Sequence, residues 1–179
     1  MIYVFLANGF EEVEAICPVD IMRRAGLSVT TVGIGGSQIT GSHGITVCAD
    51  ISEDKLNISD AEMIFLPGGM PGTLNLAASP IVKSAIEYAV ENDIYISAIC
   101  AAPSILGEMG ILKGKEAICY PGFEDKLLDA KISKKRVVKD GKIITAAGMG
   151  VATDMGLCIV EALVSKETAE KLRTAVIYD

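Results

Sequence analysis

Three stretches of the chain are continuously apolar, too short for ordinary helices, and followed at once by turn residues. They read IYVFLA (2–7), AEMIFLP (61–67) and IYISAI (94–99), and segments with helical spacing lie between them. A strand that is apolar on both faces must be covered on both faces, as in a parallel sheet with a layer of helices on each side. The sequence therefore predicts an α/β protein with a doubly wound, mostly parallel sheet.

The remaining segments continue this alternation to the end of the chain. We expect helices at 10–26, 79–93, 102–110, 151–164 and 167–176, strands at 27–34 and 116–120, a small hairpin within 35–50, and a hairpin about Asp140-Gly141 within 136–146. No linker, repeat or low-complexity segment divides the chain, and 179 residues are enough for one sizeable core. Residues 1–179 are therefore predicted to form a single domain.

Charge and composition exclude several classes of partner. The net charge is -7, from 16 Lys and Arg against 23 Asp and Glu, so a nucleic acid is not expected as a partner. No apolar run approaches the roughly 20 residues of a membrane span, and no basic leader precedes the first strand, so we expect a cytoplasmic protein. The five cysteines show no CxxC spacing and are expected to be free thiols: Cys17, Cys48, Cys100, Cys119 and Cys158.

Three turns follow predicted strands and mark the place where a ligand would bind. They are Asn8-Gly9, Gly68-Gly69 and Cys100, at the carboxyl ends of the three apolar strands. Open α/β sheets bind their ligands in the crevice at these ends. We therefore expect the three turns to converge on one site.

Cys100 stands at the join between a predicted strand and a short helix, in the stretch AICAAP. Ala98 and Ala102 are small enough for a tight turn, and Pro103 fits the first turn of the following helix. Such a turn pushes the side chain into the crevice, as in the nucleophile elbow of hydrolases. The positive end of the helix dipole would favour the thiolate, so Cys100 is predicted to be a reactive cysteine with an acidic thiol. The other four cysteines are interpreted as small apolar residues.

A nucleophilic cysteine needs a group that carries protons, and Glu14 is the better candidate. It lies near the start of the helix predicted at 10–26, and Pro18 is expected to disturb that helix at Glu14 and to aim its carboxyl at the crevice. The alternative is that Glu11, Glu12 and Glu14 only stabilise the helix N-terminus, which from the local sequence is the simpler reading of all three. The lone histidine, His43, lies in the hairpin excursion, and a Cys-His dyad is unsupported by its position.

Five segments together resemble the ThiJ/PfpI superfamily, and specifically its Parkinsonism-associated deglycase branch. They are GFEEVEAICPVDIMRRAG, FLPGG, AICAAP, VVKDGKIITAAG and CIVEAL, which occur in order over nearly the whole chain. The resemblance implies a flavodoxin-like α/β fold and a homodimer. It also implies a site without cofactor or metal, built on an acidic, oxidation-sensitive cysteine that is paired with a glutamic acid.

Residue by residue, the resemblance places the family cysteine at Cys100 and its glutamate at Glu14. Backbone N–H groups of Gly69 and Ala101 would form an oxyanion-binding site, with Gly68, Tyr120 and His43 bordering the substrate pocket. Tyr120 stands where many relatives have a histidine, and His43 stands where some have an arginine near the dimer interface. Both differences weaken the case for a protease-like Cys-His mechanism.

Two classes of function use the same two residues. The first is an enzyme acting on methylglyoxal-like aldehydes and ketoaldehydes, as a glyoxalase, or on their early adducts, as a deglycase. In it Cys100 attacks the aldehyde and Glu14 moves a proton between adjacent carbons. The second is an oxidative-stress sensor or chaperone-like protein in which Cys100 is oxidised to a sulfinate. A cysteine peptidase of the PfpI kind is the least favoured alternative.

Overall fold

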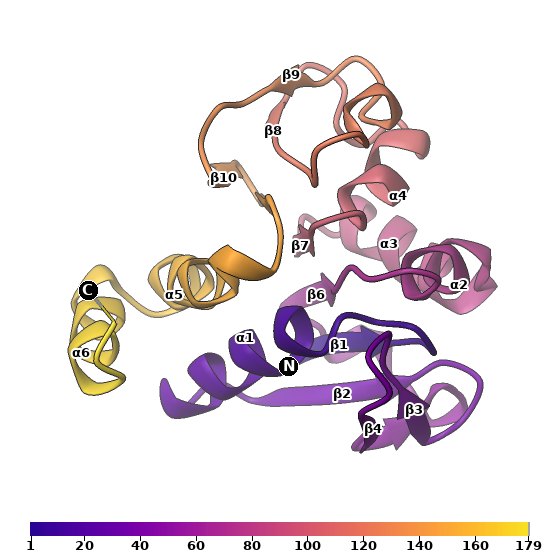
Figure 1. Ribbon diagram of the computed structural model, residues 1–179, viewed down its shortest axis with the longest axis horizontal. Coiled ribbons are helices and arrows are strands. Elements are labelled where there is room, and N and C mark those ends of the chain that lie inside the picture. Colours follow the sequence, from indigo (N-terminus) through magenta and orange to yellow (C-terminus); the bar gives the residue numbers. More distant parts are fainter. Residues whose placement is uncertain (179) are drawn as a thin grey trace.

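The computed structural model describes residues 1–178 and contains a seven-stranded sheet in the order β10-β11-β7-β6-β1-β2-β5 (Figure 1). Its strands are β1 (Ile2–Leu6), β2 (Val29–Gly33), β5 (Ile51–Ser52), β6 (Met63–Leu66), β7 (Tyr95–Ile99), β10 (Val137–Asp140) and β11 (Ile143–Ala146). All neighbouring strands are parallel except β10 and β11, which form the antiparallel hairpin expected about Asp140-Gly141. The strand order is that of a flavodoxin-like sheet, so the predicted fold class is confirmed.

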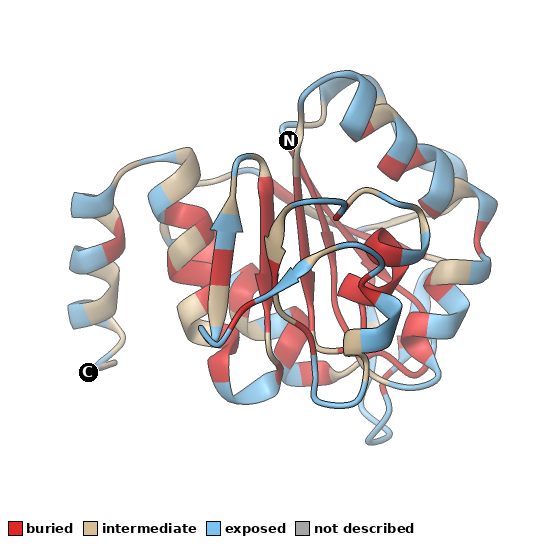
Figure 2. Cartoon of the chain, turned by 90° about the horizontal axis from the view of Figure 1, so that it is seen from above, coloured by how far each residue is buried: buried red, intermediate tan, exposed pale blue. Residues whose placement is uncertain are grey.

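Helices cover both faces of the sheet, with α1 and α5 on one side and α2, α3 and α4 on the other (Figure 1). Their bounds are α1 (Glu12–Arg24), α2 (Gly72–Ala78), α3 (Pro80–Glu91), α4 (Pro103–Glu108), α5 (Ala152–Leu163) and α6 (Lys166–Ala175), and α6 packs against α5. Alternate residues of β1 enter the two cores: Tyr3 and Phe5 pack toward α3, whereas Val4 and Leu6 pack toward α1. The strands are therefore the most deeply buried part of the chain (Figure 2).

Two small sheets lie outside the main sheet. The hairpin expected within 35–50 is present as β3 (Gln38–Thr40) and β4 (Thr46–Cys48), and β8 (Glu116–Ala117) pairs with β9 (Lys131–Ile132). The strand predicted at 116–120 thus ends after two residues. Its later N–H groups bond elsewhere, Ile118 to the Thr145 hydroxyl and Tyr120 to the carbonyl of Cys100. Short 3-10 turns complete the chain: η1 (Glu53–Lys55), η2 (Ile58–Asp60), η3 (Glu124–Lys126) and η4 (Met149–Val151).

Helix α2 was not predicted, because its seven residues begin with a glycine and no side chain caps its N-terminus. Gly72 is required there by close packing. A Cβ at this position would lie 2.5 Å from the backbone nitrogen of Phe10. Tertiary contact with the loop after β1, rather than helix propensity, therefore decides where α2 begins.

The disturbance expected in α1 at Glu14 is absent, because the helix is continuous from Glu12 to Arg24 with Pro18 inside it. Helix α5 packs closely against this segment, and a Cβ on Gly156 would lie 3.2 Å from the Cα of Pro18. The close packing of α5 supports the continuous helix at the proline. Glu14 is therefore directed by its place in the first turn of α1 and not by a break.

Among residues 1–178, no helix has both the length and the apolar character that crossing a membrane would need. The cytoplasmic location expected from the sequence stays a prediction.

Two leucines on α2 provide a matched test of the packing of this helix. Leu76 is fully buried in the core on the α3 side of the sheet, whereas Leu74 is 53% exposed. Leu76→Ala should lower the free energy of unfolding by about 2–5 kcal/mol, because it leaves a cavity beneath α2. Leu74→Ala should change it by less than about 0.5 kcal/mol. Urea denaturation followed by circular dichroism measures both, and equal losses would contradict the burial assigned to α2.

Candidate functional site

The turns after β1, β6 and β7 meet at the carboxyl ends of these strands, as the sequence predicts. The N–H of Glu11 donates to the carbonyl of Gly68 at 2.9 Å, and the N–H of Gly72 donates to the carbonyl of Gly9 at 3.0 Å. Cys100 lies beside Gly68, since a Cβ on that glycine would be 2.6 Å from the Cβ of Cys100. These backbone contacts bring three distant parts of the sequence into a common crevice.

Cys100 occupies a strained turn directly after β7. Its φ of 64° lies in the left-handed region, which residues other than glycine rarely adopt. Its N–H donates to the carbonyl of Ala146 at 2.9 Å, and its carbonyl accepts the N–H of Tyr120 at 2.7 Å. Two neighbouring segments thus hold the cysteine in an unfavourable conformation that places its side chain at the end of the sheet, as expected for a nucleophile elbow.

Glu14 is almost completely buried, with 1% of its surface exposed. Its Oε2 atom has no hydrogen-bond partner of good geometry within residues 1–178. Burial raises the pKa of Glu14 to about 7, and the negative charge of Glu11 adds to this, while the Cys100 thiol and the backbone N–H groups of Gly68 and Met149 oppose it. A carboxyl with such a pKa can both hold and release a proton near neutral pH.

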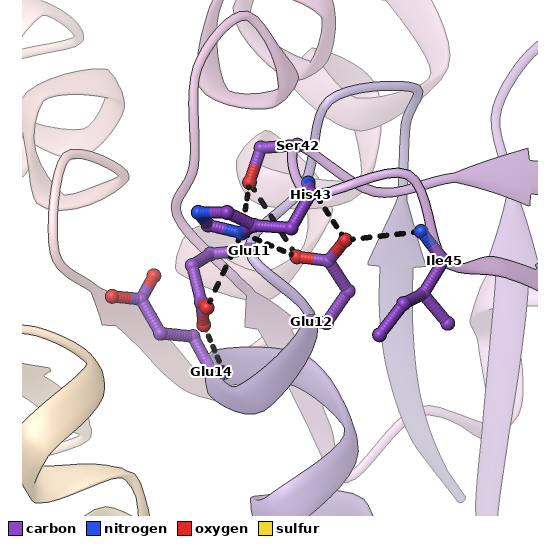
Figure 3. Close-up of polar contacts among 6 residues, drawn as sticks. All are labelled: Glu11, Glu12, Glu14, Ser42, His43 and Ile45. Carbon is purple, nitrogen blue, oxygen red and sulfur yellow. Dashed lines mark hydrogen bonds and ion pairs between the residues drawn. The ribbon is translucent and has the colours of Figure 1, made fainter.

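The three glutamates at the start of α1 have three separate roles (Figure 3). Glu11 caps the helix, because its carboxylate accepts the N–H of Glu14 at 2.7 Å. Glu12 turns to the β3–β4 hairpin and accepts bonds from its tip. Only Glu14 faces Cys100. The simpler reading, in which all three merely favour the helix N-terminus, therefore describes Glu11 alone.

The glycines after β6 allow Glu14 and Cys100 to come together. A Cβ on Gly68 would lie 2.5 Å from Oε2 of Glu14, so any side chain there would displace the carboxyl. Gly69 has a φ of 93°, and its N–H and that of Ala101 approach the sulfur of Cys100. Two backbone donors thus point to the position where negative charge would develop.

The acidic thiol expected at Cys100 stays a prediction, because the titration of Cys100 depends on whether Glu14 is ionised. Burial, followed by the charge of Glu14 and its hydrogen bond with the thiol, raises the pKa of Cys100 to about 12, and the N–H groups of Gly69 and Ala101 only partly oppose this. The dipole of α4 favours the thiolate less than that of a long helix, because α4 is only six residues long. Because each group changes the titration of the other, Cys100 and Glu14 titrate as a pair.

Two side chains were expected to border the substrate pocket. Tyr120 does flank the space next to Glu14, whereas His43 lies next to Glu12. A Cβ on Gly148 would be 3.3 Å from the ring of Tyr120 and 3.7 Å from Oε1 of Glu14, so the half-exposed ring flanks the space next to the carboxyl. The ring of His43 instead contacts Glu11, Glu12 and Ser42 (Figure 3).

The loop after β11 was overlooked as a part of the site. Its residues Gly148 and Met149 approach Glu14, yet only three strand ends were considered as the edge of the crevice. The signal was present in the sequence, because the glycines in AAGMG directly follow a fourth predicted strand.

A surface cavity of about 480 Å³ lies away from this site, at the amino ends of β7 and β11, and is lined by Lys115 and Lys142.

One cluster resembles a metal site in composition. Ligand atoms of Glu11, Glu12 and His43 lie within 4.8 Å of one another. Both carboxylate oxygens of Glu12 already accept hydrogen bonds from the hairpin, and Nδ1 of His43 lies 3.0 Å from one of them. The cluster is therefore accounted for as a hydrogen-bonded ion pair, and the sequence-based expectation of no metal stays a prediction.

Comparison with known proteins shows the family of this chain. The chain belongs to the DJ-1/PfpI family, whose model matches residues 1–162. It is 38% identical over 179 residues to the Parkinson disease protein 7 homolog of Danio rerio, covering 97% of this chain and 95% of the relative. It is 30% identical to the glutathione-independent glyoxalase DJR-1.2 of Caenorhabditis elegans, covering 90% and 87%. The family resemblance noted in the sequence is thus confirmed.

Solved structures of the same family share the whole architecture. Oxidized DJ-1 of Toxoplasma gondii superposes with a TM-score of 0.95 at 31% identity, covering 99% of this chain and 97% of that one. DJ-1beta of Drosophila melanogaster gives a TM-score of 0.93 at 33% identity, again covering 99% and 97%.

Removing the charge of Glu14 should make Cys100 more reactive toward alkylation. In Glu14→Gln the carboxylate that raises the pKa of Cys100 is gone, and each unit by which the pKa falls gives about tenfold more thiolate at a fixed pH. We expect faster reaction with iodoacetamide at pH 8, measured by peptide mapping, with Cys17 and Cys158 as internal controls. An unchanged or slower rate at Cys100 would show that Glu14 does not oppose formation of the thiolate.

Proposed function

We propose that this protein is an enzyme that converts small α-ketoaldehydes such as methylglyoxal to hydroxy acids without a cofactor. The observation that carries the proposal is the buried Glu14 carboxyl, with a pKa of about 7, facing Cys100 at its strained turn. A nucleophile, a group that can move a proton and two backbone donors are the parts that this reaction requires. The relative named glutathione-independent glyoxalase supports the same class of reaction.

The mechanism begins with the proton that Cys100 and Glu14 share. When this proton lies on Glu14, the thiolate of Cys100 attacks the aldehyde carbon and forms a hemithioacetal, while the N–H groups of Gly69 and Ala101 bind the oxyanion. Glu14 protonates that oxygen, then removes the proton from the former aldehyde carbon and returns it to the adjacent carbon, while the hydroxyl proton moves from the former aldehyde oxygen to the ketone oxygen. The product is a thioester of the hydroxy acid. Water hydrolyses it and releases the free thiol, so the net reaction is addition of one water to the ketoaldehyde.

Action on early carbonyl adducts of amines and thiols, the deglycase reaction, is a second substrate class for the same residues. Hemiaminals and hemithioacetals of the same aldehydes release the free aldehyde in equilibrium, so depletion of the aldehyde alone would remove them. The half-exposed ring of Tyr120 next to Glu14 leaves the crevice open on one side, which is compatible with a larger adduct.

A redox sensor is the alternative that a specific observation favours. Within residues 1–178, Oε2 of Glu14 has no hydrogen-bond partner of good geometry, and a protonated carboxyl could donate a hydrogen bond to an oxidised sulfur. Two successive reactions with peroxide would convert the thiolate first to a sulfenic acid and then to a sulfinic acid. A related structure is that of an oxidized protein. A Cys-His peptidase has less support, because the imidazole of the only histidine bonds to Glu12.

Substitution of Glu14 separates the enzyme from the sensor. Glu14→Gln has the same size but cannot carry a proton between two carbons, so the formation of lactate from methylglyoxal should fall at least about a hundredfold, the low end of general acid–base contributions. Glu14→Asp keeps an ionisable group that is one methylene shorter, and partial loss is expected. Lactate is measured enzymatically on the same preparations whose sulfinate content is determined by intact mass.

Each outcome of that experiment assigns a function. Loss of turnover in Glu14→Gln with continued oxidation by peroxide would support the enzyme. Full turnover in Glu14→Gln would contradict the proton transfer. Absence of turnover in the unmodified protein, together with stable formation of the sulfinate, would favour the sensor.

A homodimer is the oligomer that we propose for this chain. Val13 and Ile16 on α1 are 44% and 41% exposed, and Ile45 in the hairpin beside Glu12 is 58% exposed. Large apolar side chains exposed on neighbouring elements mark protein–protein contact surfaces. Multi-angle light scattering should give twice the chain mass of 18.8 kDa, and Ile16→Glu should reduce it to that of the single chain. A single-chain mass for the unmodified protein would rule out the dimer.

A further inference from the structure

A buried carboxylate fills the tip of the β3–β4 hairpin. Glu12 is only 7% exposed although it lies in the first turn of a helix. Its Oε1 accepts the N–H of His43 at 2.8 Å and that of Ile45 at 3.4 Å, and its Oε2 lies 3.0 Å from Nδ1 of His43 and 3.5 Å from the Ser42 hydroxyl (Figure 3). The hairpin tip is therefore folded around a side chain from another element.

The hairpin and the loop after β1 form one hydrogen-bonded unit. The carbonyl of Thr40 accepts the N–H of Gly9 at 2.8 Å, and the N–H of Ser42 donates to the carbonyl of Phe10 at 2.7 Å. A Cβ on Gly41 would collide with the carboxyl of Glu12, so only a glycine fits at this position. Movement of the hairpin tip would therefore move the loop that leads into α1.

This loop is also one wall of the candidate site. The N–H of Glu11 holds the carbonyl of Gly68, the backbone of Phe10 and Glu11 packs against Gly69, and the carboxylate of Glu11 caps the N–H of Glu14. Gly69 supplies a donor to the sulfur of Cys100. The chain of contacts therefore runs from the hairpin tip to both sides of the reacting sulfur.

His43 gives this contact a charge that changes with pH. The charged groups that face its ring are Glu12, at 3.0 Å, and Glu11, whose Oε1 lies 4.0 Å from Nδ1. Within the described chain, no lysine or arginine forms an ion pair with either glutamate. The hydrogen bond with Glu12, followed by its charge, raises the pKa of His43. Burial acts to raise the pKa of Glu12, but the bonds from His43 and from backbone N–H groups hold it at about 2.

We propose that Glu12 is a positioning residue for the Cys100 site and that protonation of His43 tightens its hold on the hairpin. A protonated imidazole forms a charge-assisted bond with the carboxylate, which a neutral ring replaces with a weaker one. As the pH rises through the titration of His43, the charged bond gives way to the weaker one, while the backbone donors remain. The proposal rests on the proposed function only where turnover is concerned, because the positions of Gly69 and Cys100 can be tested without a substrate.

The first experiment uses the fact that the chain has a single histidine. The imidazole proton signals in a one-dimensional NMR titration therefore belong to His43 without assignment. We expect a pKa above the ordinary value of about 6.5 in the unmodified protein and a return toward about 6.5 in Glu12→Gln. Glu91→Gln, at the exposed end of α3, is the matched control and should leave the titration unchanged.

The second experiment asks whether this titration reaches the site. The rate of Cys100 alkylation by iodoacetamide is measured against pH in the unmodified protein and in His43→Gln, which keeps a donor but does not titrate. The rate in the unmodified protein divided by the rate in His43→Gln should fall by about threefold as the pH rises past the NMR midpoint of His43. An effect of this size is expected for an exposed ion pair. Amide exchange at His43 and Ile45, corrected for intrinsic rates, should accelerate over the same pH range.

Two results would overturn the proposal. One is a ratio of alkylation rates that stays flat through the titration of His43. The other is hairpin amide protection in Glu12→Gln equal to that of the unmodified protein, and if that variant fails to fold, His43→Gln alone decides through the ratio. A protein that alkylates as expected but does not convert methylglyoxal would contradict the proposed function and still support the positioning role.

Discussion

The left-handed backbone of Cys100 is the constraint around which the site is built. A φ of 64° is unfavourable for a cysteine, and it persists because Ala146 of β11 and Tyr120 each form a hydrogen bond with its backbone. This conformation places the sulfur beyond the end of β7, next to the N–H groups of Gly69 and Ala101. The surrounding sheet supplies the rigidity that this conformation needs.

Burial of Glu14 is the second unfavourable feature of the site, and it is chemically connected to the first. In residues 1–178, one carboxyl oxygen of Glu14 has no partner of good geometry, and its burial raises the pKa of Glu14. Burial and the charge of Glu14 in turn raise the pKa of the Cys100 thiol. Replacing Glu14 by an apolar side chain would relieve this cost. Its presence beside Cys100 is therefore best understood through the proton that the two groups share, as both proposed functions require.

Much of this arrangement could be predicted from the sequence, and the omissions have physical causes. The apolar runs at 2–7, 61–67 and 94–99 indicated the parallel sheet, and their ends located the crevice. Helix α2 was missed because packing of Gly72, not propensity, sets its start. The acidity of Cys100 cannot be judged from its turn alone, because desolvation and a facing carboxylate oppose the end of a short helix.

The sequence by itself determined the fold class, most of the strands and helices and the turn at Cys100, because hydrophobic periodicity and the small residues of a turn act locally. Glu14 was paired with Cys100 only through the family resemblance. The tertiary structure alone decided what each of three adjacent glutamates does. Glu11 caps, Glu12 holds the hairpin and Glu14 faces Cys100, although all three stand in one helical turn. The partners of Glu12 and Glu14 come from segments about 30 and 90 residues away, and a local pattern does not show the long-range packing that joins such segments.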